Sequence, residues 1–391
     1  MRLLFYKRRF AWPRSSGHDV HTFHMMKALA SLGCELSLAT MEAPAPEAID
    51  GLDLGRCVVL PGNGSPSPGA IRATRAEERY RSYWGVPAAA VAGLAAAARD
   101  LRADAVVVSG LDVLPMLCGI EGALRVWYAA DEWFWHHCSQ LQVTRPSTWS
   151  ELKTATVKGL YERAHRRRLD RVWVVSAADA TAMRWIAGVR NVDILPNGVD
   201  TDLYGAAGSE VTPETCVFWG RLDFGPNIQA LEWFCGHVWP AVRARHPQAT
   251  FTVIGFQPGE EVQRLVRLPG VRLEADVPDI RTAVAGQAVV VLPFVSGGGI
   301  KNKLLEAAAM AKAVVCTPRA LGGLNGHPPV RVARSTADWC EAIESLWSDP
   351  PRRLQVGLEA REWVIAEHTW TAAARKALDR LRQSPSPGAV V

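Results

Sequence analysis

The sequence predicts an α/β protein made of two doubly wound, parallel-sheet domains. Wholly apolar runs, such as 105–108 and 288–292, alternate with helical segments along the chain. Strands this apolar are buried on both faces, which is typical of parallel sheets covered by helices on both sides. The length of 391 residues also suits two domains of roughly 150 to 200 residues better than one.

The first half begins with a strand at 2–6, a helix at 19–32 and a second strand at 35–40. This order predicts a βαβ unit with Gly17 at the start of its helix and Gly33 at its end. Further strands of this half are expected at 105–108, 124–128, 171–175 and 192–195.

The pattern restarts after a turn-rich connection at 194–204. Gly17, Gly220 and the three glycines 297–299 all follow strand ends, so we expect one ligand site in a cleft at the carboxyl ends of both sheets. This arrangement alone also fits a dinucleotide enzyme or a periplasmic-type binding protein. Strands of the second half are expected at 215–219, 250–254, 271–273 and 288–292.

Composition narrows the class of protein. With 48% hydrophobic and 21% charged residues the chain is globular, and no apolar run reaches the ~20 residues of a spanning helix. The apolar part of its start is too short for a signal peptide. Eight scattered cysteines without a CxxC pair indicate buried, reduced thiols, a cytoplasmic location and no zinc site. The net charge of +5 argues against a nucleic-acid partner.

The stretch SGGGIKNKLLEAAAMAKAVV, 296–315, carries the strongest functional signal. Three glycines, Lys301 and Lys303 follow a buried strand and open an alanine-rich helix. A helix N-terminus offers unpaired N–H groups and partial positive charge, so this pattern predicts a phosphate site. The alternative is a tight strand-to-helix turn with no ligand.

Several motifs together resemble a known family: PNGVD, GRLDFGPN, DVPDI, AVVVLPF and GGGIKNKLLEAAAMAKAVVCTP. The chain resembles family 4 glycosyltransferases of the GT-B fold, and is most similar to bacterial sugar transferases of polysaccharide loci. The resemblance covers nearly the whole chain and is strongest over 190–320. It implies two Rossmann-like domains facing a central cleft, with the acceptor bound by the first and a nucleotide sugar by the second.

In that family two glutamates stand eight positions apart in the second domain. Glu306 matches the second, which implies a bidentate contact to the ribose diol, whereas Gly298 stands where the first is expected. Lys303 and Arg221 are implied diphosphate ligands that stabilise the leaving group. The alternatives are a solvated Lys303–Glu306 pair and a surface arginine. Gly17, Asn227, Gly299 and Ile300, together with Gly298, complete the expected donor-binding residues.

The first domain offers an aromatic and acidic patch, 127–137, after a predicted strand end. Asp131, Glu132 and Trp133 suit stacking on sugar faces and accepting hydroxyl protons, and His18 joins them as an expected acceptor-binding residue. The alternative is a partly buried aromatic cluster whose carboxylates cap the next helix. The first 200 residues hold 24 basic and 20 acidic side chains, which favours an anionic acceptor or a membrane surface.

The expected reaction is sugar transfer from a UDP- or GDP-sugar, UDP being preferred, to a sugar, a lipid-linked glycan or another hydroxyl acceptor. The resemblance implies retention, and no metal or other cofactor is expected. Asp131 is the candidate base if the reaction inverts.

The alternative function is a non-catalytic sugar-nucleotide-binding partner subunit. An NAD-type oxidoreductase lacks its GxGxxG fingerprint here. The protein is expected in the cytoplasm, with possible peripheral association at the inner face of the membrane.

The end of the chain is amphipathic, with Trp370, Ala374 and Leu378 at helical spacing. The resemblance implies that this helix, 367–384, crosses back from the nucleotide domain to the acceptor domain. The expected domains are therefore 1–198 and 199–366, and residues 385–391 are expected to form a disordered tail.

Overall fold

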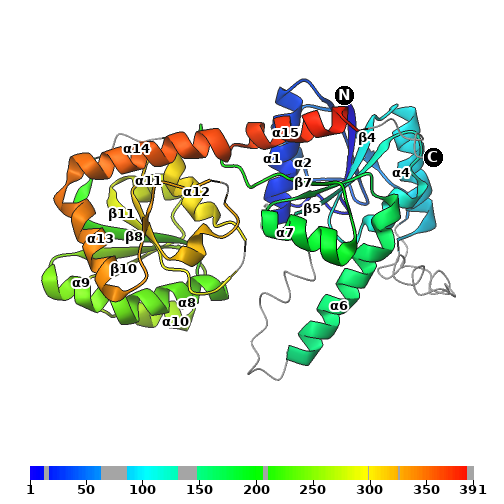
Figure 1. The fold of residues 1–391 in the computed structure, drawn as a ribbon. Helices are drawn as coiled ribbons and strands as arrows, with labels where there is room; N and C mark the ends of the chain where they lie inside the picture. The colour runs from blue at the N-terminus through cyan, green and yellow to red at the C-terminus, as the bar shows by residue number, and fades with distance from the viewer. Residues whose placement is uncertain are drawn as a thin grey trace. The chain divides into compact units, whose positions relative to one another are not determined.

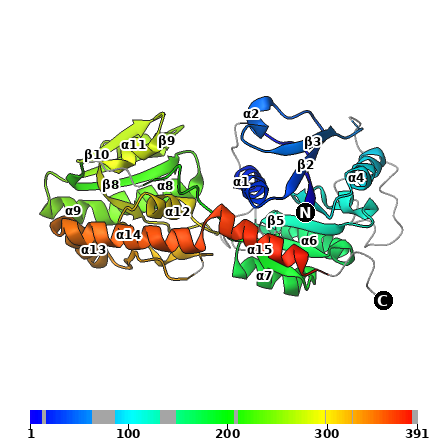
Figure 2. The same cartoon turned by 90° about the horizontal axis from the view of Figure 1, so that it is seen from above.

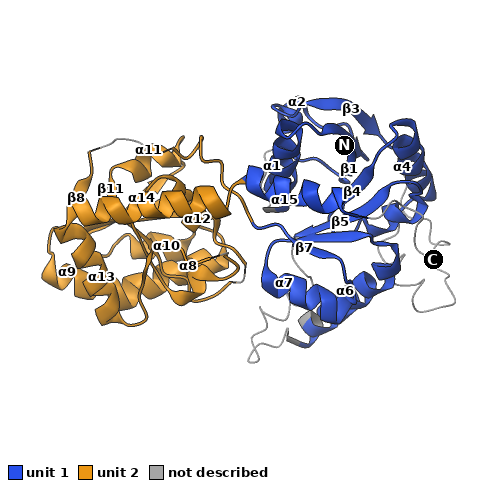
Figure 3. Ribbon diagram, turned by 45° about the horizontal axis from the view of Figure 1, so that its top comes forward, with its two compact units in different colours: residues 1–196, 370–391 blue, residues 197–369 orange. Residues whose placement is uncertain are grey.

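The computed structural model describes residues 1–12, 17–62, 86–130, 148–205, 210–297, 299–324 and 326–384. The chain divides into two compact units (Figure 3): residues 1–196 with 370–391, and residues 197–369. The second boundary follows Thr369, so the last helix belongs to the first unit. The expected tail, 385–391, lies outside the described residues.

The first unit is built on a seven-stranded parallel sheet of order β3-β2-β1-β4-β5-β6-β7. This is the doubly wound order: successive strands are added on one side of β1 up to β3, and then on its other side from β4 onward. All expected strands of this half are present. The strands are β1 (Arg2–Tyr6), β2 (Glu35–Thr40), β3 (Leu54–Val59), β4 (Ala105–Ser109), β5 (Leu124–Ala130), β6 (Arg171–Val174) and β7 (Val192–Ile194).

Strand β3 was not expected from the sequence. It pairs with β2 in parallel at the edge of the sheet, and most of its side chains are exposed. Because LGRCVV is not buried on either face, it lacks the continuous apolar pattern that marks the inner strands. Cys57 in this strand is exposed and Cys118 is half-buried, whereas the other five described cysteines are buried thiols.

Alternate side chains of the first sheet point to two separate cores. Leu4 and Tyr6 pack with α4 and α7, whereas Leu3 and Phe5 pack with α1 and α15. The contact between α1 and α15 can be followed in Figures 1 and 2. The helices are α1 (Gly17–Ser31), α2 (Pro46–Ile49), α4 (Ala88–Asp100), α6 (Thr148–His165), α7 (Ala177–Ala182) and α15 (Trp370–Arg382), with short helices η2 (Leu114–Gly119), η3 (Arg166–Arg168) and η4 (Met183–Ala187).

The second unit repeats the topology with a six-stranded parallel sheet of order β10-β9-β8-β11-β12-β13. Its strands are β8 (Thr212–Arg221), β9 (Thr250–Phe256), β10 (Val271–Ala275), β11 (Gln287–Leu292), β12 (Val314–Cys316) and β13 (Arg331–Val332). Its helices are α8 (Gly225–Trp233), α9 (Trp239–Arg245), α10 (Glu260–Leu265), α11 (Ile280–Ala285), α12 (Asn302–Ala309), α13 (Thr336–Ser348) and α14 (Pro350–Glu367), with short helices η5 (Phe234–Val238) and η6 (Pro318–Leu321).

Two glycines let β8 and β9 approach closely where both strands end. Gly220 pairs with Gly255 in register, and a Cβ built on Gly255 would lie 1.8 Å from the Gly220 carbonyl oxygen. Such a separation is far below contact distance, so this position accepts only glycine. The end of β8 is also joined to the start of α8, because Asn227 Nδ2 donates to Arg221 O.

The two segments that connect the units are hydrogen-bonded to each other inside the second unit. Val199 N donates to His368 O at 2.8 Å, and His368 Nδ1 lies 3.1 Å from Asn197 O. Asn197 Nδ2 also donates to Asn302 Oδ1 at 2.7 Å, which ties this region to the first residue of α12. These bonds explain why the unit extends from 197 to 369 rather than from 199 to 366.

Two further properties concern the described residues alone. None of their helices combines the length and the apolar character needed to span a membrane. No group of three or more histidine, cysteine, aspartate or glutamate side chains is placed among them so as to hold a metal ion.

Candidate functional site

The glycine loop connects β11 to α12 at the carboxyl end of the second sheet. Gly297 has φ +85° and Gly299 has φ +70°, a left-handed backbone that glycine adopts without steric cost. Gly298 lies outside the described residues. The expectation that α12 opens on the glycines is wrong. The helix begins at Asn302, with Lys301 as its N-cap residue, because left-handed residues cannot form its first turn.

Lys303 lies in the first turn of α12 and is held from three sides. Its Nζ donates to Asn227 Oδ1 at 3.3 Å and lies 5.6 Å from the Phe218 ring centroid and 5.8 Å from that of Phe294. Burial lowers the pKa of Lys303, and the nearby carboxylate of Glu306 partly opposes that shift. The ammonium is therefore a positioned, partly desolvated cation rather than one half of a solvated surface pair.

Gly220 makes room for this lysine. It has φ +146°, and a Cβ built on it would lie 2.5 Å from Lys303 Cε and 2.6 Å from Nζ. Any side chain at position 220 would displace the ammonium group. Gly220, near the end of β8, thus makes room for a lysine of α12. Spacing along the chain does not reveal this relation.

Glu306 lies one turn further along α12. Trp219 Nε1, at the end of β8, donates to its Oε2 at 2.7 Å. Burial raises the pKa of Glu306, while the indole hydrogen bond and Lys303 lower it. The carboxylate is partly exposed, and the indole fixes its orientation. Such a group can accept hydrogen bonds from a pair of vicinal hydroxyls.

Asn227, in the first turn of α8, connects Lys303 to the end of β8. Its side chain is buried, and its Nδ2 donates to the Arg221 carbonyl at 2.7 Å while its Oδ1 accepts from Lys303. The structure therefore places Asn227 and Glu306 near Lys303.

The side chain of Arg221 is placed differently. Its guanidinium is exposed and makes a two-point contact with Asp223, with Nε–Oδ1 at 3.0 Å and Nη2–Oδ2 at 2.7 Å. Each partner favours the charged form of the other, which raises the pKa of Arg221 and lowers that of Asp223. A diphosphate role for Arg221 requires this pair to open or to bind as a unit.

Lys301 is a site residue that the sequence interpretation did not select. Its Nζ donates to the carbonyl oxygens of Gly297 at 3.2 Å and Gly299 at 3.1 Å and lies 5.4 Å from the Phe294 ring centroid. Burial, with repulsion from Lys303 and Arg319, lowers its pKa to about 8. The signal was present in GGGIKNK, where two lysines stand two positions apart. Ile300 between the loop and the helix would lie 3.0 Å from a Cβ built on Gly323.

In the first unit, Gly17 begins α1, and His18 next to it lies beside the end of β4. His18 Nδ1 is 3.1 Å from Ser109 Oγ, and burial followed by repulsion from Lys7 lowers its pKa to about 4. The imidazole is therefore neutral at neutral pH. Lys7 forms an ion pair with Asp19 in the first turn of α1. Asp131, Glu132 and Trp133 lie outside the described residues.

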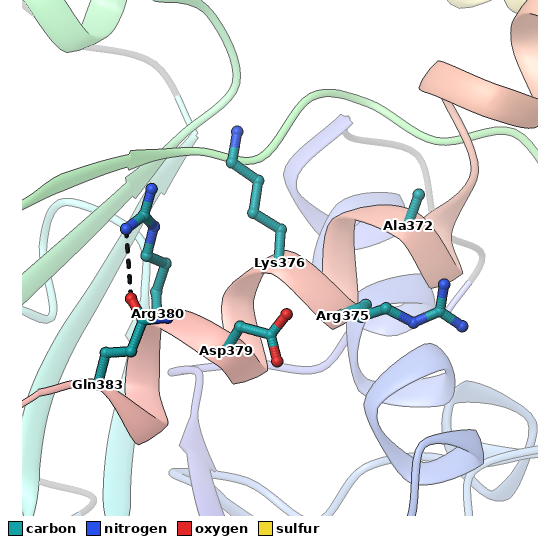
Figure 4. Close-up of a pocket in the computed structure, with 6 residues that line it drawn as sticks. All are labelled: Ala372, Arg375, Lys376, Asp379, Arg380 and Gln383. Atoms are coloured by element: carbon teal, nitrogen blue, oxygen red, sulfur yellow. Dashed lines mark hydrogen bonds between the residues drawn. The ribbon is translucent and has the colours of Figure 1, made fainter.

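A surface hollow on the first unit is unrelated to these groups. It runs along the exposed face of α15 (Figure 4) and has a volume of about 490 Å³. Its lining comes from α15 and the residue that follows it, and its cations point apart without converging on a common point. The lining residues are Ala372, Arg375, Lys376, Asp379, Arg380 and Gln383.

Two family models match successive parts of the chain. Residues 15–203 match the model of Glycosyltransferase Family 4, and residues 213–349 match that of Glycosyl transferases group 1. No curated protein matches the sequence.

Solved structures share the fold over almost the whole chain. HepE of Anabaena, in complex with UDP and glucose, is 15% identical with a TM-score of 0.66 over 98% of this chain and 100% of its own. Sucrose-phosphate synthase of Thermosynechococcus elongatus is 15% identical with a TM-score of 0.65 over 98% of each chain. A mutant of TarM of S. aureus, in complex with fondaparinux, α-GlcNAc-glycerol and UDP, is 11% identical with a TM-score of 0.66 over 98% of this chain and 100% of its own.

Both units match glycosyltransferase models, and both sheets have the doubly wound order. The chain therefore belongs to the family 4-like glycosyltransferases of the GT-B fold and is an enzyme, a glycosyltransferase.

Proposed function

We propose that this enzyme transfers a sugar from a UDP-sugar to an acceptor hydroxyl, with the donor held by the second unit. The observation that carries the proposal is the arrangement on α12: two ammonium groups at the helix N-terminus and an oriented carboxylate one turn later. This order of charges matches the order of groups in a nucleoside diphosphate, with its anionic diphosphate next to a ribose diol. The complexes of HepE with UDP and glucose and with UDP-glucose support UDP over GDP.

In the proposed complex, Glu306 accepts hydrogen bonds from the ribose hydroxyls. Lys303, Lys301 and the backbone N–H groups of Gly299 and Ile300 face the diphosphate, and Asn227 orients Lys303. Arg221 contributes if its pair with Asp223 opens. Gly298, which lies outside the described residues, is kept as a candidate donor-binding residue from the sequence alone.

The catalytic role of these cations is to stabilise the leaving group. When the anomeric C–O bond breaks, the electron pair stays on the β-phosphate oxygen, and its charge grows beside fixed ammonium groups and the helix N-terminus. This arrangement supplies the stabilisation that a divalent metal would otherwise supply, so we propose a metal-independent reaction. Retention at the anomeric carbon follows if the released phosphate oxygen accepts the acceptor's hydroxyl proton on the same face of the sugar.

Acceptor binding is assigned to the first unit, with His18, Asp131, Glu132 and Trp133 as candidate residues. The neutral His18 accepts or donates a hydrogen bond without adding charge, which suits a sugar hydroxyl. The proposed acceptors are a sugar, a lipid-linked glycan or another hydroxyl compound. Asp131 would act as the base if the reaction inverted the configuration.

The decisive experiment is calorimetric titration of the full chain with UDP, GDP and their sugar derivatives, followed by detection of UDP released from each donor. We expect UDP and at least one UDP-sugar to bind and GDP to bind more weakly. Proton NMR of the product's anomeric signal then separates retention from inversion. If no nucleotide binds and no donor is hydrolysed or transferred, the assignment of α12 to a nucleoside diphosphate is wrong.

A further inference from the structure

Helix α6 of the first unit presents an exposed stripe in which apolar and basic side chains alternate. Trp149, Lys153, Thr156, Leu160 and Arg163 are spaced by four, three, four and three residues, which places them on one face of the helix. All five are exposed, and the indole of Trp149 is 80% exposed. Large aromatic side chains normally bury most of their surface, so this stripe has the character of a contact surface.

A second indole lies on the segment that packs beside this helix. The short helix η4 contacts α6, and Arg163 Nη1 donates to Ile186 O at 3.1 Å. The neighbouring Trp185 is 82% exposed. Trp149 lies near the start of α6 and Trp185 beside its end, and covering either exposed indole is favoured by the hydrophobic effect. Together with the stripe, Trp185 defines what we call the α6–η4 face.

The charge of this face is one-sided among the described side chains. Glu162 and Asp179 are buried, and Asp170 pairs with Arg125 through a contact of 2.8 Å. The exposed charged side chains described on α6, η3, η4 and the following turn are Lys153, Arg163, Arg167, Arg184 and Arg190. A partner for this face must therefore carry negative charge and also accept indole rings.

We propose that the α6–η4 face docks this enzyme on an anionic lipid surface. Tryptophan settles at the headgroup level of a bilayer, where its ring is in an apolar layer and its N–H in a polar one. Lysine and arginine beside it reach the lipid phosphates. A soluble polyanion would engage the cations but leave both indoles in water. The inference goes beyond the transfer reaction and is independent of its donor and acceptor.

The basic face of α15 provides an internal control. It presents Arg375, Lys376 and Arg380 on the same unit, but also Asp379, and its lining contains no aromatic side chain (Figure 4). If positive charge alone recruited the protein, this face would contribute as strongly as α6–η4. Double substitutions that replace two basic side chains by glutamine can therefore be compared between the α6–η4 face and α15, which belong to the same unit.

The test is flotation of the full-length protein with vesicles of neutral phosphatidylcholine, or with vesicles that contain about 30% phosphatidylglycerol, at about 0.1 M and 0.5 M salt. We expect binding to the anionic vesicles that weakens at high salt, together with a blue shift of tryptophan fluorescence. Lys153→Gln with Arg167→Gln should weaken vesicle partitioning about thirtyfold, since each charge near an anionic surface contributes a factor of about five. Trp149→Ala with Trp185→Ala should weaken it and remove most of the blue shift.

The control pair, Arg375→Gln with Lys376→Gln, should bind vesicles as the wild type does. All variants alter exposed positions, and their melting temperatures verify that the fold is kept. The proposal is overturned if the wild type does not bind vesicles. It is also overturned if all three double variants bind vesicles equally. Binding to a soluble acidic polysaccharide with none to vesicles overturns it as well and assigns the face to a polyanion.

Discussion

The two units share one topology but differ in charge where their helices begin. In both sheets the chain order reverses beside the first strand, between β1 and β4 and between β8 and β11. In the second unit, Lys301 and Lys303 open α12 and are held by carbonyl and amide oxygens. In the first unit, Lys7 pairs with Asp19, and burial keeps His18 neutral at neutral pH.

This difference separates what topology decides from what side chains decide. The doubly wound order places helix N-termini and loop backbones at one edge of each sheet, where ligands bind in such folds. It does not select the ligand. Lysines held by carbonyl and amide oxygens suit the anionic donor that we propose, whereas a neutral imidazole and a lysine paired with an aspartate suit a hydroxyl compound.

The largest effect is expected from Lys303→Met, which removes the cation in the first turn of α12 and nearly keeps the volume of its side chain. The rate of sugar transfer should fall by about 10² to 10³, the usual cost of losing one group that stabilises developing charge. Steady-state kinetics measure it. The matched control, Lys376→Met on the exposed face of α15, should leave the rate unchanged. If the Lys303→Met enzyme transfers sugar at the wild-type rate, the charge of Lys303 does not give the second unit its role in the reaction.

Glu306→Gln is expected to weaken UDP binding about ten- to hundredfold, because a charge-assisted hydrogen bond is replaced by a neutral one. Trp219 can still donate to the amide oxygen, so the fold of the site should be kept. Calorimetric titration with UDP provides the value. Equal affinities of the variant and the wild type would exclude the ribose contact.

A pH dependence of several-fold is expected from Lys301. Its pKa of about 8 means that the ammonium is present below this pH and is lost above it, so UDP affinity should fall between about pH 7 and 9. Lys301→Arg, which stays charged, should remove that step. No step between about pH 5 and 7 is expected from His18, whose pKa is lowered to about 4. The same pH curve for Lys301→Arg and the wild type would contradict the role of Lys301.

The smallest effect is expected from removing divalent metal. Excess EDTA should leave the transfer rate nearly unchanged, because two lysines and a helix N-terminus already face the proposed diphosphate. The measurement is turnover with and without EDTA, followed by added manganese. Loss of turnover that manganese restores would show that the second unit depends on a metal as well as on its own cations.

Much of the fold was readable from patterns in the sequence. Inner strands such as β4 and β11 are short apolar runs buried on both faces, and burial is what makes such a run recognisable. The edge strand β3 was missed because its exposed side chains carry no such pattern. The predicted start of α12 was several residues too early. Glycine can either open a helix or form the turn before it, and only the backbone angles distinguish the two cases.

The site divides in the same way. Glu306 and Lys303 could be selected because they share one short segment with the glycines, so their proximity is local. Lys301 was visible in that segment, but its two carbonyl contacts and its neighbour Arg319 depend on how the loop folds. The pairing of Arg221 with Asp223 was not foreseen, since a two-residue spacing permits but does not require that contact.

By itself, the sequence determined the α/β class, the family and the segment that we propose as the donor site, because these depend on local composition and spacing. The tertiary structure decided the rest. Gly220 had to be glycine because Lys303, from a different strand's helix, passes against it. Trp219 orients Glu306 across 87 residues of chain. Contacts of this kind join segments remote in sequence, and the burial that shifts their pKa values exists only once the sheet of the second unit has formed.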